Sequence, residues 1–321
     1  MSIFVYEHLT SGALAGEALS PSMLQEGNAM VRAISHDLAT LGYPVVMMRD
    51  SRIPALQDPS GRISTLPIDS LEIWQQTWQQ SLRQFQQFLV IAPETGGILA
   101  QLVGDLEHKL KRHLGSSAKA IALCSDKLRC SQYLLEHGIP SPQTFKASVW
   151  LNTAEHPASG DWVIKPLDGA GCEQTFKMPA RQAQAYLASL PSNELDRMII
   201  QPYLEGTPLS LNLFIDDTQL DILSVNRQHI TESDHQLHLS HCEAGREDLI
   251  DYPAMLKLTE KIRTAMPGLW GFVGIDLVQS TDKLWLIEIN PRLTASYAEP
   301  AFRQNRNPAL RLQQNLKGCA H

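Results

Sequence analysis

The amino-acid sequence predicts a mixed fold, of α/β class near the N-terminus and of α+β class in the remainder. Short apolar runs alternate with helical patterns over residues 1–112, and paired apolar runs separated by polar turns recur beyond residue 198. A length of 321 residues allows two or three domains and a large core. We therefore divide the chain into an N-terminal Rossmann-like domain over 1–112, a small lobe over 113–198 and a C-terminal lobe over 199–321.

Composition narrows the classes of function. Hydrophobic content is 43% and charged content 19%, which is typical of a soluble globular protein. The net charge of -7 argues against a nucleic-acid surface, and no apolar run is long enough to predict a membrane span. The first residues lack the pattern of a signal peptide, and the five cysteines form no C-x-x-C pair. We expect a cytoplasmic protein that acts on small molecules, without a nucleic-acid or membrane partner.

The first unit alternates strands and helices. In order, the pattern predicts the strand Ile3–Tyr6, a helix from Ser20-Pro21 to Gly42, the strand Val45–Met48, a polar loop over 49–70, the helix Ser70–Gln87, the strand Phe88–Ile91 and a helix to about Arg112. This order implies a parallel sheet, which binds ligands beyond the carboxyl ends of its strands. Glu7–Gly12 and Glu94–Gly97 occupy such positions, although ordinary turns are an equally good interpretation.

The second unit contains two lysines beside a glycine-containing turn. Asp126-Lys127 precedes a helix over Leu128–His137, and the strand Trp162–Pro166 includes Lys165 near its end. The turn that follows includes Asp168, Gly169, Ala170, Gly171 and Cys172. Small residues let a backbone approach a phosphate, so that amide N–H groups can serve as donors. The turn matches no common nucleotide motif, and a surface lysine beside an ordinary turn is the alternative interpretation.

The third unit begins with a strand that turns at Gln201–Gly206. Antiparallel strands are predicted at Leu209–Ile215 and Asp221–Val225, and a helix at Tyr252–Met266. The segment between them contains four histidines, namely His229, His235, His238 and His241, and also Cys242. Their spacings match no zinc pattern, so we interpret this segment as a strand and a mobile loop.

Gly271–Arg292 is the most informative stretch and reads as a β-hairpin with strands at Phe272–Gln279 and Leu284–Asn290. A turn centred on Asp282 places Asp276 opposite Glu288 and Gly274 opposite Asn290. The opposite face is then apolar and belongs to the core; it comprises Ile275, Leu277, Ile287 and Ile289.

Two directly opposed carboxylates destabilise a sheet unless a cation lies between them. Asp276, Glu288 and the amide oxygen of Asn290 are hard ligands of the kind that Mg²⁺ prefers, and Glu288 and Asn290 point to the same face. Arg292 follows Pro291 at the end of the strand, where it could meet an anion. The alternative is an ordinary hairpin with a solvated polar face.

Together these segments resemble the ATP-grasp superfamily over roughly residues 113–300. The resemblance lies in the order of Asp126-Lys127, then Lys165-Pro166 with its glycine turn, then Gln201–Gly206, then G-I-D…E-I-N-P-R. It implies the ATP-grasp fold, with two lobes that clasp ATP behind an N-terminal domain. It also implies an enzyme that joins a carboxylate to an amine through an acylphosphate.

The resemblance assigns roles to individual residues. Lys127 and Lys165 would bind phosphates, under the loop formed by Asp168, Gly169, Ala170, Gly171 and Cys172. Gln201, Tyr203, Leu204 and Glu205 would lie at the adenine hinge and the ribose. Asp276, Glu288 and Asn290 would hold Mg²⁺, for which Mn²⁺ could substitute, and Arg292 and Lys165 would act on the transferred phosphoryl group. The sequence departs from the family at Pro208, where an acid often binds ribose, and at Gly274, where the D-alanine–D-alanine ligase branch has arginine.

The N-terminal stretches F-V-Y-E-H-L-T-S-G and S-P-S-M-L-Q-E-G resemble the tyramine–glutamate ligase group of the same superfamily. That resemblance implies the glutamate side chain as the carboxylate, an aromatic amine as the nucleophile and a place in making methanofuran-type cofactors. Glu7, Glu26 or Glu94 would then orient a substrate. The sequence does not give the oligomeric state, but ATP-grasp proteins are often dimers, so the resemblance to that superfamily is compatible with a homodimer. The alternatives are a small-molecule kinase on this fold or a nucleotide-binding protein without turnover.

Overall fold

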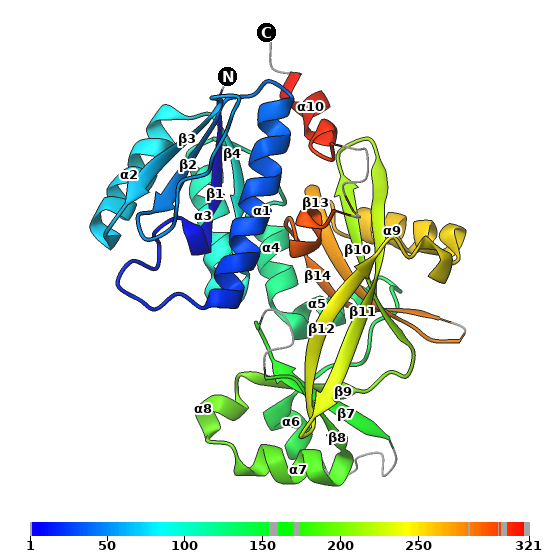
Figure 1. The fold of residues 1–321 in the computed structure, drawn as a ribbon. Coiled ribbons are helices and arrows are strands. Elements are labelled where there is room, and N and C mark those ends of the chain that lie inside the picture. The colour runs from blue at the N-terminus through cyan, green and yellow to red at the C-terminus, as the bar shows by residue number, and fades with distance from the viewer. Residues whose placement is uncertain are drawn as a thin grey trace.

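The computed structural model describes residues 2–153, 160–169, 174–281, 283–300, 302 and 307–317. Within these ranges the chain forms a five-stranded parallel sheet and a nine-stranded sheet in which the paired strands are antiparallel. Figure 1 shows the parallel sheet with its helices at one end, the small lobe at the other, and the C-terminal lobe between them. None of the helices in these ranges is long and apolar enough to cross a membrane.

The N-terminal sheet has strand order β3-β2-β1-β4-β5, with the fully buried β1 (Ile3–Glu7) at its centre. Helix α1 (Pro21–Thr40) packs on one face, against Ile3 and Val5. Helices α2 (Leu71–Gln84) and α3 (Ile98–His108) pack on the other face, against Phe4 and Tyr6. The remaining strands are β2 (Val45–Asp50), β3 (Ile63–Ile68), β4 (Gln87–Ile91) and β5 (Arg112–His113).

The expectation of a loop over the whole of 49–70 was wrong, because Ile63–Ile68 forms strand β3. It pairs with β2 in parallel and lies at the edge of the sheet. Pro67 cannot donate a ladder hydrogen bond, and an edge strand is where a sheet tolerates such a residue. The predicted parallel order of the other strands is confirmed.

The small lobe is built on four antiparallel strands with helices against them. The strands are β6 (Phe145–Lys146), β7 (Asp161–Pro166), β8 (Phe176–Pro179) and β9 (Met198–Pro202), and the helices are α6 (Ala147–Leu151), α7 (Ala180–Ser189) and α8 (Ser192–Leu195). Trp150, Trp162 and Leu187 are buried together in its core. The small lobe is thus a separate layer with a core of its own.

The C-terminal lobe carries the other five strands of the large sheet. They are β10 (Thr207–Ile215), β11 (Leu220–Ser233), β12 (Gln236–Ala244), β13 (Gly271–Gln279) and β14 (Leu284–Asn290). Helices α4 (Ala118–Ser125), α5 (Lys127–Glu136) and α9 (Tyr252–Ala265) share a core with these strands. The short helix α10 (Leu310–Lys317) returns to the N-terminal domain, where Leu312 packs in the same core as Ile34 of α1.

Strands β11 and β12 form a long hairpin that runs from the C-terminal lobe to the small lobe (Figure 1). Its tip joins the small lobe through Gln236, which pairs with Phe176 of β8, and through the Lys177 N–H, which donates to the His235 carbonyl at 2.7 Å. The expected mobile loop was therefore wrong for the described residues. His229 and His241 lie opposite each other, with their rings stacked at 4.1 Å.

The division of the chain at 112/113 and 198/199 stays a prediction. Packing nevertheless shows where the segments near these points lie. Strand β9, which spans the second point, pairs with β6 and β7 of the small lobe. Helices α4 and α5, which follow the first point, share the core of the C-terminal lobe. The small lobe is therefore an insertion into the C-terminal lobe, because α4 and α5 before it and β10 after it share the core of that lobe.

Candidate functional site

A cleft of about 380 Å³ lies where the three parts of the chain meet. The N-terminal domain contributes carboxylates and apolar side chains, the small lobe a lysine and a hinge strand, and the C-terminal lobe the polar face of its last hairpin. The sequence-predicted residues that line the cleft are Glu7, Glu26, Lys165, Gln201, Tyr203, Leu204, Asp276, Glu288, Asn290 and Arg292. Segments far apart in sequence thus place their polar groups in one cavity.

The last hairpin has the register predicted from its sequence where it borders the cleft. Asp276 pairs with Glu288, and Gly274 pairs with Asn290. Gly274 has a packing reason to lack a side chain, because a Cβ there would lie 2.5 Å from the Thr294 Cγ2. The two carboxylates therefore share the polar face of the hairpin, as the alternation of the strands predicted.

The register changes directly beyond the carboxylate pair, and there the symmetric prediction was wrong. Leu277 pairs with Leu286, so Ile287 is the extra residue of a β-bulge. Leu286 is fully buried in the core, whereas Ile287 lines the cleft. A bulge sends one residue to the opposite face from the one that strict alternation predicts. Here it adds an apolar side chain to the cavity beside Glu288.

Asp276 is held by two amide groups. Gln228 Nε2 of β11 donates to its Oδ1 at 2.9 Å, and Asn290 Nδ2 donates to its Oδ2 at 3.1 Å. Burial and the facing Glu288 raise the pKa of Asp276 from its ordinary value of 3.8 to about 7, against the two amide donors and Lys165. Gln228 was not predicted from the sequence, since only the pairing of β10 with both β11 and β13 brings it here.

The raised pKa of Asp276 gives the protein without metal or nucleotide a specific dependence on pH. The folded state holds the Asp276 proton up to about pH 7, whereas the unfolded state releases it near 3.8. Between these values the native state binds more protons, so this carboxyl makes the protein less stable as pH rises. Replacing the carboxyl by an uncharged amide removes that penalty. We expect Asp276→Asn to gain about 2–3 kcal/mol in free energy of unfolding, relative to wild type, between pH 5 and pH 8.

Urea unfolding at the two pH values, in the presence of a chelator, measures this difference. Asp217→Asn, which changes an exposed carboxylate in the β10–β11 turn, is the matched control and should show no such gain. An Asp276→Asn advantage of equal size at pH 5 and pH 8 would contradict the buried, charge-opposed environment of Asp276.

The donor set suits a hard divalent cation. Asp276, Glu288 and Asn290 present oxygen atoms on one face, and two facing carboxylates repel each other unless positive charge lies near them. Lys127 Nζ lies 3.0 Å from Glu288 Oε1 and supplies part of that charge. No three His, Cys, Asp or Glu side chains gather as a metal cluster anywhere in the described ranges, and the hairpin itself offers two carboxylates and one amide oxygen. On this donor set the hairpin is the candidate cation site.

The two predicted phosphate lysines come from different lobes, Lys127 from α5 of the C-terminal lobe and Lys165 from β7 of the small lobe. Lys127, the first residue of α5, also donates to the Gly169 carbonyl, at the start of the glycine turn. Lys165 is 6% exposed and lines the cleft. Asp168 accepts a hydrogen bond from the Gly96 N–H at 3.2 Å. The other predicted loop residues, Ala170, Gly171 and Cys172, lie outside the described residues.

The predicted hinge borders the apolar end of the cleft. Gln201 is buried, and its Oε1 accepts a hydrogen bond from Thr144 Oγ1 at 3.4 Å. Tyr203 packs under Lys177, whose Nζ lies 4.2 Å from the ring centroid. Glu205 is exposed and is absent from the lining residues, whereas Pro208 lines the cleft. Apolar residues that the sequence did not single out complete this end, namely Val163, Ile230, Leu237 and Leu239.

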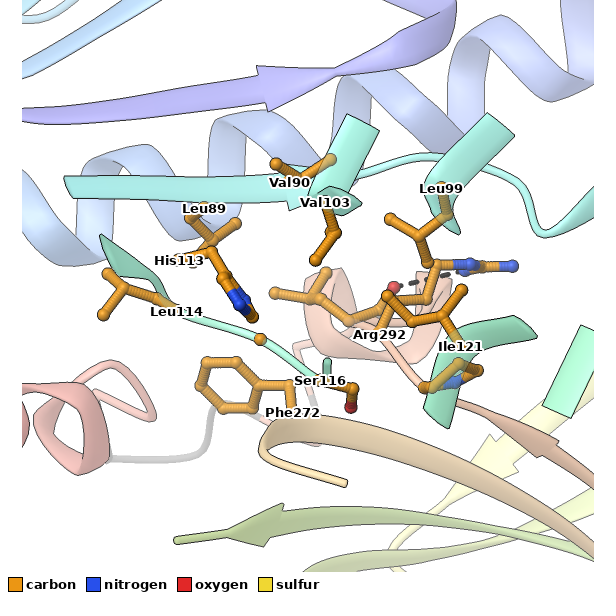
Figure 2. A pocket seen from close by; sticks show the side chains of 13 residues that line it. Leu89, Val90, Leu99, Val103, His113, Leu114, Ser116, Ile121, Phe272 and Arg292 are labelled. Carbon is orange, nitrogen blue, oxygen red and sulfur yellow. Dashed lines mark hydrogen bonds between the residues drawn. The ribbon is translucent and has the colours of Figure 1, made fainter. Parts of the chain in front are cut away.

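Arg292 and Glu94 meet at the border of the N-terminal domain. Arg292 Nη2 donates to Glu94 Oε2 at 3.0 Å, and Nε lies 2.9 Å from Oε1. Figure 2 shows the small neighbouring pocket along which the Arg292 side chain runs, with its guanidinium at the end away from His113. That pocket holds about 20 Å³, enough for roughly one water molecule. It is too small for a substrate.

The N-terminal domain adds carboxylates at the ends of its strands and on α1. Glu7 is 3% exposed, accepts hydrogen bonds from the N–H groups of Leu9 and Thr10, and has its pKa raised by burial. Gly27 of α1 lets the helix approach, since a Cβ there would lie 2.7 Å from the Glu7 carboxylate. Glu26 is exposed at the cleft edge. Glu7, the last residue of β1, lines the cleft, as expected for a residue at the carboxyl end of a strand in a parallel sheet.

A nucleotide-sized cleft between two antiparallel lobes, behind a parallel-sheet domain, defines a protein of the ATP-grasp class. The chain belongs to the ATP-grasp family: residues 124–296, more than half of the chain, match the family model described as an ATP-grasp domain. Residues 43–121 match the model described as a pre ATP-grasp 3 domain.

Curated relatives include the tyramine–L-glutamate ligases of Methanocaldococcus fervens and Methanocaldococcus jannaschii. They are 29% and 26% identical to this chain over 212 residues, which is 65% of the chain. The matches span 59% and 56% of the length of those relatives. A solved structure of an ATP-grasp superfamily protein from Archaeoglobus fulgidus is similar over 98% of this chain and 88% of its own. Its TM-score is 0.70 and its identity 24%, which shows the shared fold.

Proposed function

We propose that the protein is an ATP- and Mg²⁺-dependent ligase that joins a carboxylate to an amine and releases ADP and phosphate. The observation that carries the proposal is the facing of Asp276 and Glu288 in a cleft that Lys165 and Arg292 also line, with Lys127 Nζ 3.0 Å from Glu288 Oε1. Phosphoryl transfer depends on cations placed around developing negative charge, with little covalent help from the protein. Family membership and the curated relatives support the same class of reaction.

The proposed reaction has two steps. A carboxylate oxygen of the acceptor attacks the γ-phosphorus of ATP, the bond to the bridging oxygen breaks, and ADP leaves. The amine nitrogen then attacks the acyl carbon, the bond between that carbon and the phosphate oxygen breaks, and the nitrogen loses a proton. Lys127 and Lys165 bind the phosphates, and Arg292 stabilises charge on the transferred group. Asp276, Glu288 and Asn290 would hold Mg²⁺, which neutralises phosphate charge when bound.

The end of the cleft next to the N-terminal domain suits an amine with an apolar body. Its carboxylates are Glu7 and Glu26, and apolar side chains from Leu9, Met23 and Met30 lie in the same wall. A carboxylate attracts an ammonium group, and methionines adapt to flat apolar rings. We therefore propose an aromatic amine such as tyramine as the nucleophile and the side chain of glutamate as the acceptor. The curated relatives are named for tyramine and L-glutamate.

A screen of ADP release tests this function. Purified protein with ATP and Mg²⁺ is offered carboxylates and amines in pairs, starting with glutamate and tyramine, and the coupled product is identified by mass. We expect ADP release that requires both substrates, and an acyl-hydroxamate when hydroxylamine replaces the amine. Phosphorylation of a hydroxyl without hydroxamate would instead indicate a kinase. ATP binding without ADP release for any pair would refute the proposed ligase.

A cytoplasmic location, a homodimer and a place in making methanofuran-type cofactors stay predictions from the sequence. Glu205, for its part, is expected at the ribose only on the family resemblance, because its exposed side chain lies outside the lining of the cleft.

A further inference from the structure

The turn that follows β4 touches two different parts of the proposed phosphoryl-transfer machinery. Glu94, which is 8% exposed, forms the ion pair with Arg292 just beyond β14. Two residues later, the Gly96 N–H donates to Asp168, directly before the glycine turn. Glu94 and Gly96 lie in the pre-ATP-grasp match, whereas Asp168 and Arg292 lie in the ATP-grasp match. A single turn of the N-terminal domain therefore contacts both Arg292 and Asp168 of the ATP-grasp domain.

The backbone of this turn is suited to that double contact. Gly96 and Gly97 have φ angles of 65° and 72°, in the left-handed region that favours glycine. The Gly97 N–H closes the turn on the Glu94 carbonyl at 3.0 Å. This turn directs the Glu94 side chain towards Arg292 and the Gly96 N–H towards Asp168. Helix α3 begins directly afterwards at Ile98, which anchors the turn to the domain.

We propose that Glu94 is a positioning residue, which aims the guanidinium of Arg292 at the transferred phosphoryl group. The inference rests on the proposed function. An arginine side chain is long and has about 2 kcal/mol of rotamer entropy, so a partner that holds it in place before reaction lowers the cost of using it.

The same contact separates this role from that of a substrate ligand. Glu94 already faces a full positive charge on Arg292, at 2.9 Å and 3.0 Å, which offsets its attraction for a substrate ammonium. Glu7 and Glu26 line the cleft without such a cationic contact of comparable length among the described residues. The geometry thus favours Glu94 as the partner of Arg292, and not as a residue that orients the amine substrate.

The test is steady-state kinetics of Glu94→Gln, which keeps the shape of the side chain and removes its charge. We expect kcat to fall on the order of 10- to 100-fold, while the KM values for ATP and for the amine change less than about threefold. When Arg292 is already replaced by lysine, Glu94→Gln should lower kcat less than about threefold, because the guanidinium that Glu94 positions is no longer present. Glu72→Gln, on the exposed start of α2, is the matched control.

Each outcome decides the matter. A raised amine KM with unchanged kcat would make Glu94 a substrate ligand and overturn the inference. An equal loss of kcat on Glu94→Gln substitution with Arg292 and with Arg292→Lys would also overturn the inference. So would a Glu94→Gln enzyme as fast as wild type. Neither result would contradict the proposed ligase function. A Glu94→Gln protein that melts like wild type but loses kcat supports it. A wild type that releases no ADP with any substrate pair would refute the proposed function and this inference together.

Discussion

Asp276→Ala and Glu288→Ala should each abolish turnover, with ADP release falling by about 10³-fold or more. The two carboxylates face each other on one side of the last hairpin, and each removal halves the negative charge offered to a cation. Glu288→Ala also leaves Lys127 without its partner at 3.0 Å. Because the metal would neutralise the phosphates at the moment of transfer, its loss should lower kcat and not only the affinity for ATP.

The measurement is ADP release with saturating ATP, at several Mg²⁺ concentrations, for a substrate pair active with wild type. Asp217→Ala, which removes an exposed carboxylate from a turn, should keep wild-type activity. A chelator should inactivate wild type in the same way as the two substitutions. Near-wild-type ADP release by either hairpin variant would show that the cation site has been placed wrongly.

Lys127→Met should weaken ATP binding and lower kcat/KM by roughly 10²- to 10³-fold. The ammonium lies between Glu288 and the Gly169 carbonyl, so it connects the carboxylate pair to the start of the glycine turn. Its side chain is 7% exposed, which keeps water from replacing the lost charge effectively. Methionine retains the length and the apolar stem of lysine, so the loss should be electrostatic.

Calorimetric titration with ATP and Mg²⁺ measures the affinity, and ADP release measures the rate. Lys119→Met, at an exposed position on α4, makes the same chemical change away from the cleft and should behave as wild type. If Lys127→Met bound ATP as tightly as Lys119→Met, then Lys127 would serve only to neutralise Glu288. Stability towards urea, measured beside the titration, separates a local loss from unfolding.

Local patterns in the sequence predicted most of the fold that carries these residues. Alternating strands and helices predicted the parallel order of β1, β2 and β4, and the two-residue period of strands predicted that Asp276 faces Glu288. The helix predicted at Ser70–Gln87 is present as α2, and the structure adds that the Ser70 hydroxyl caps it by accepting from the Ile73 N–H. Errors fell where local signals are weak, as in strand β3 at a sheet edge.

The order of the motifs was also sufficient to name the family and to nominate Lys127, Lys165 and the hairpin carboxylates. These residues belong to short segments with distinct composition, and a family resemblance carries them residue by residue. Whether they act as proposed awaits the substitutions described above. The tertiary structure adds that Lys165 and the hairpin carboxylates line a single cleft and that Lys127 forms an ion pair with Glu288.

The sequence alone therefore determined the alternation of strands and helices that implies a parallel sheet, the final hairpin and the pairing of its carboxylates, because each of these patterns involves residues close together in the chain. Only the tertiary structure decided that Gln228 binds Asp276, that a bulge turns Ile287 into the cleft and that Glu94 holds Arg292. These contacts join residues from strands or domains that no periodicity relates. The first two arise from how the strands of the C-terminal lobe pair, and the third from how the N-terminal domain packs on that lobe.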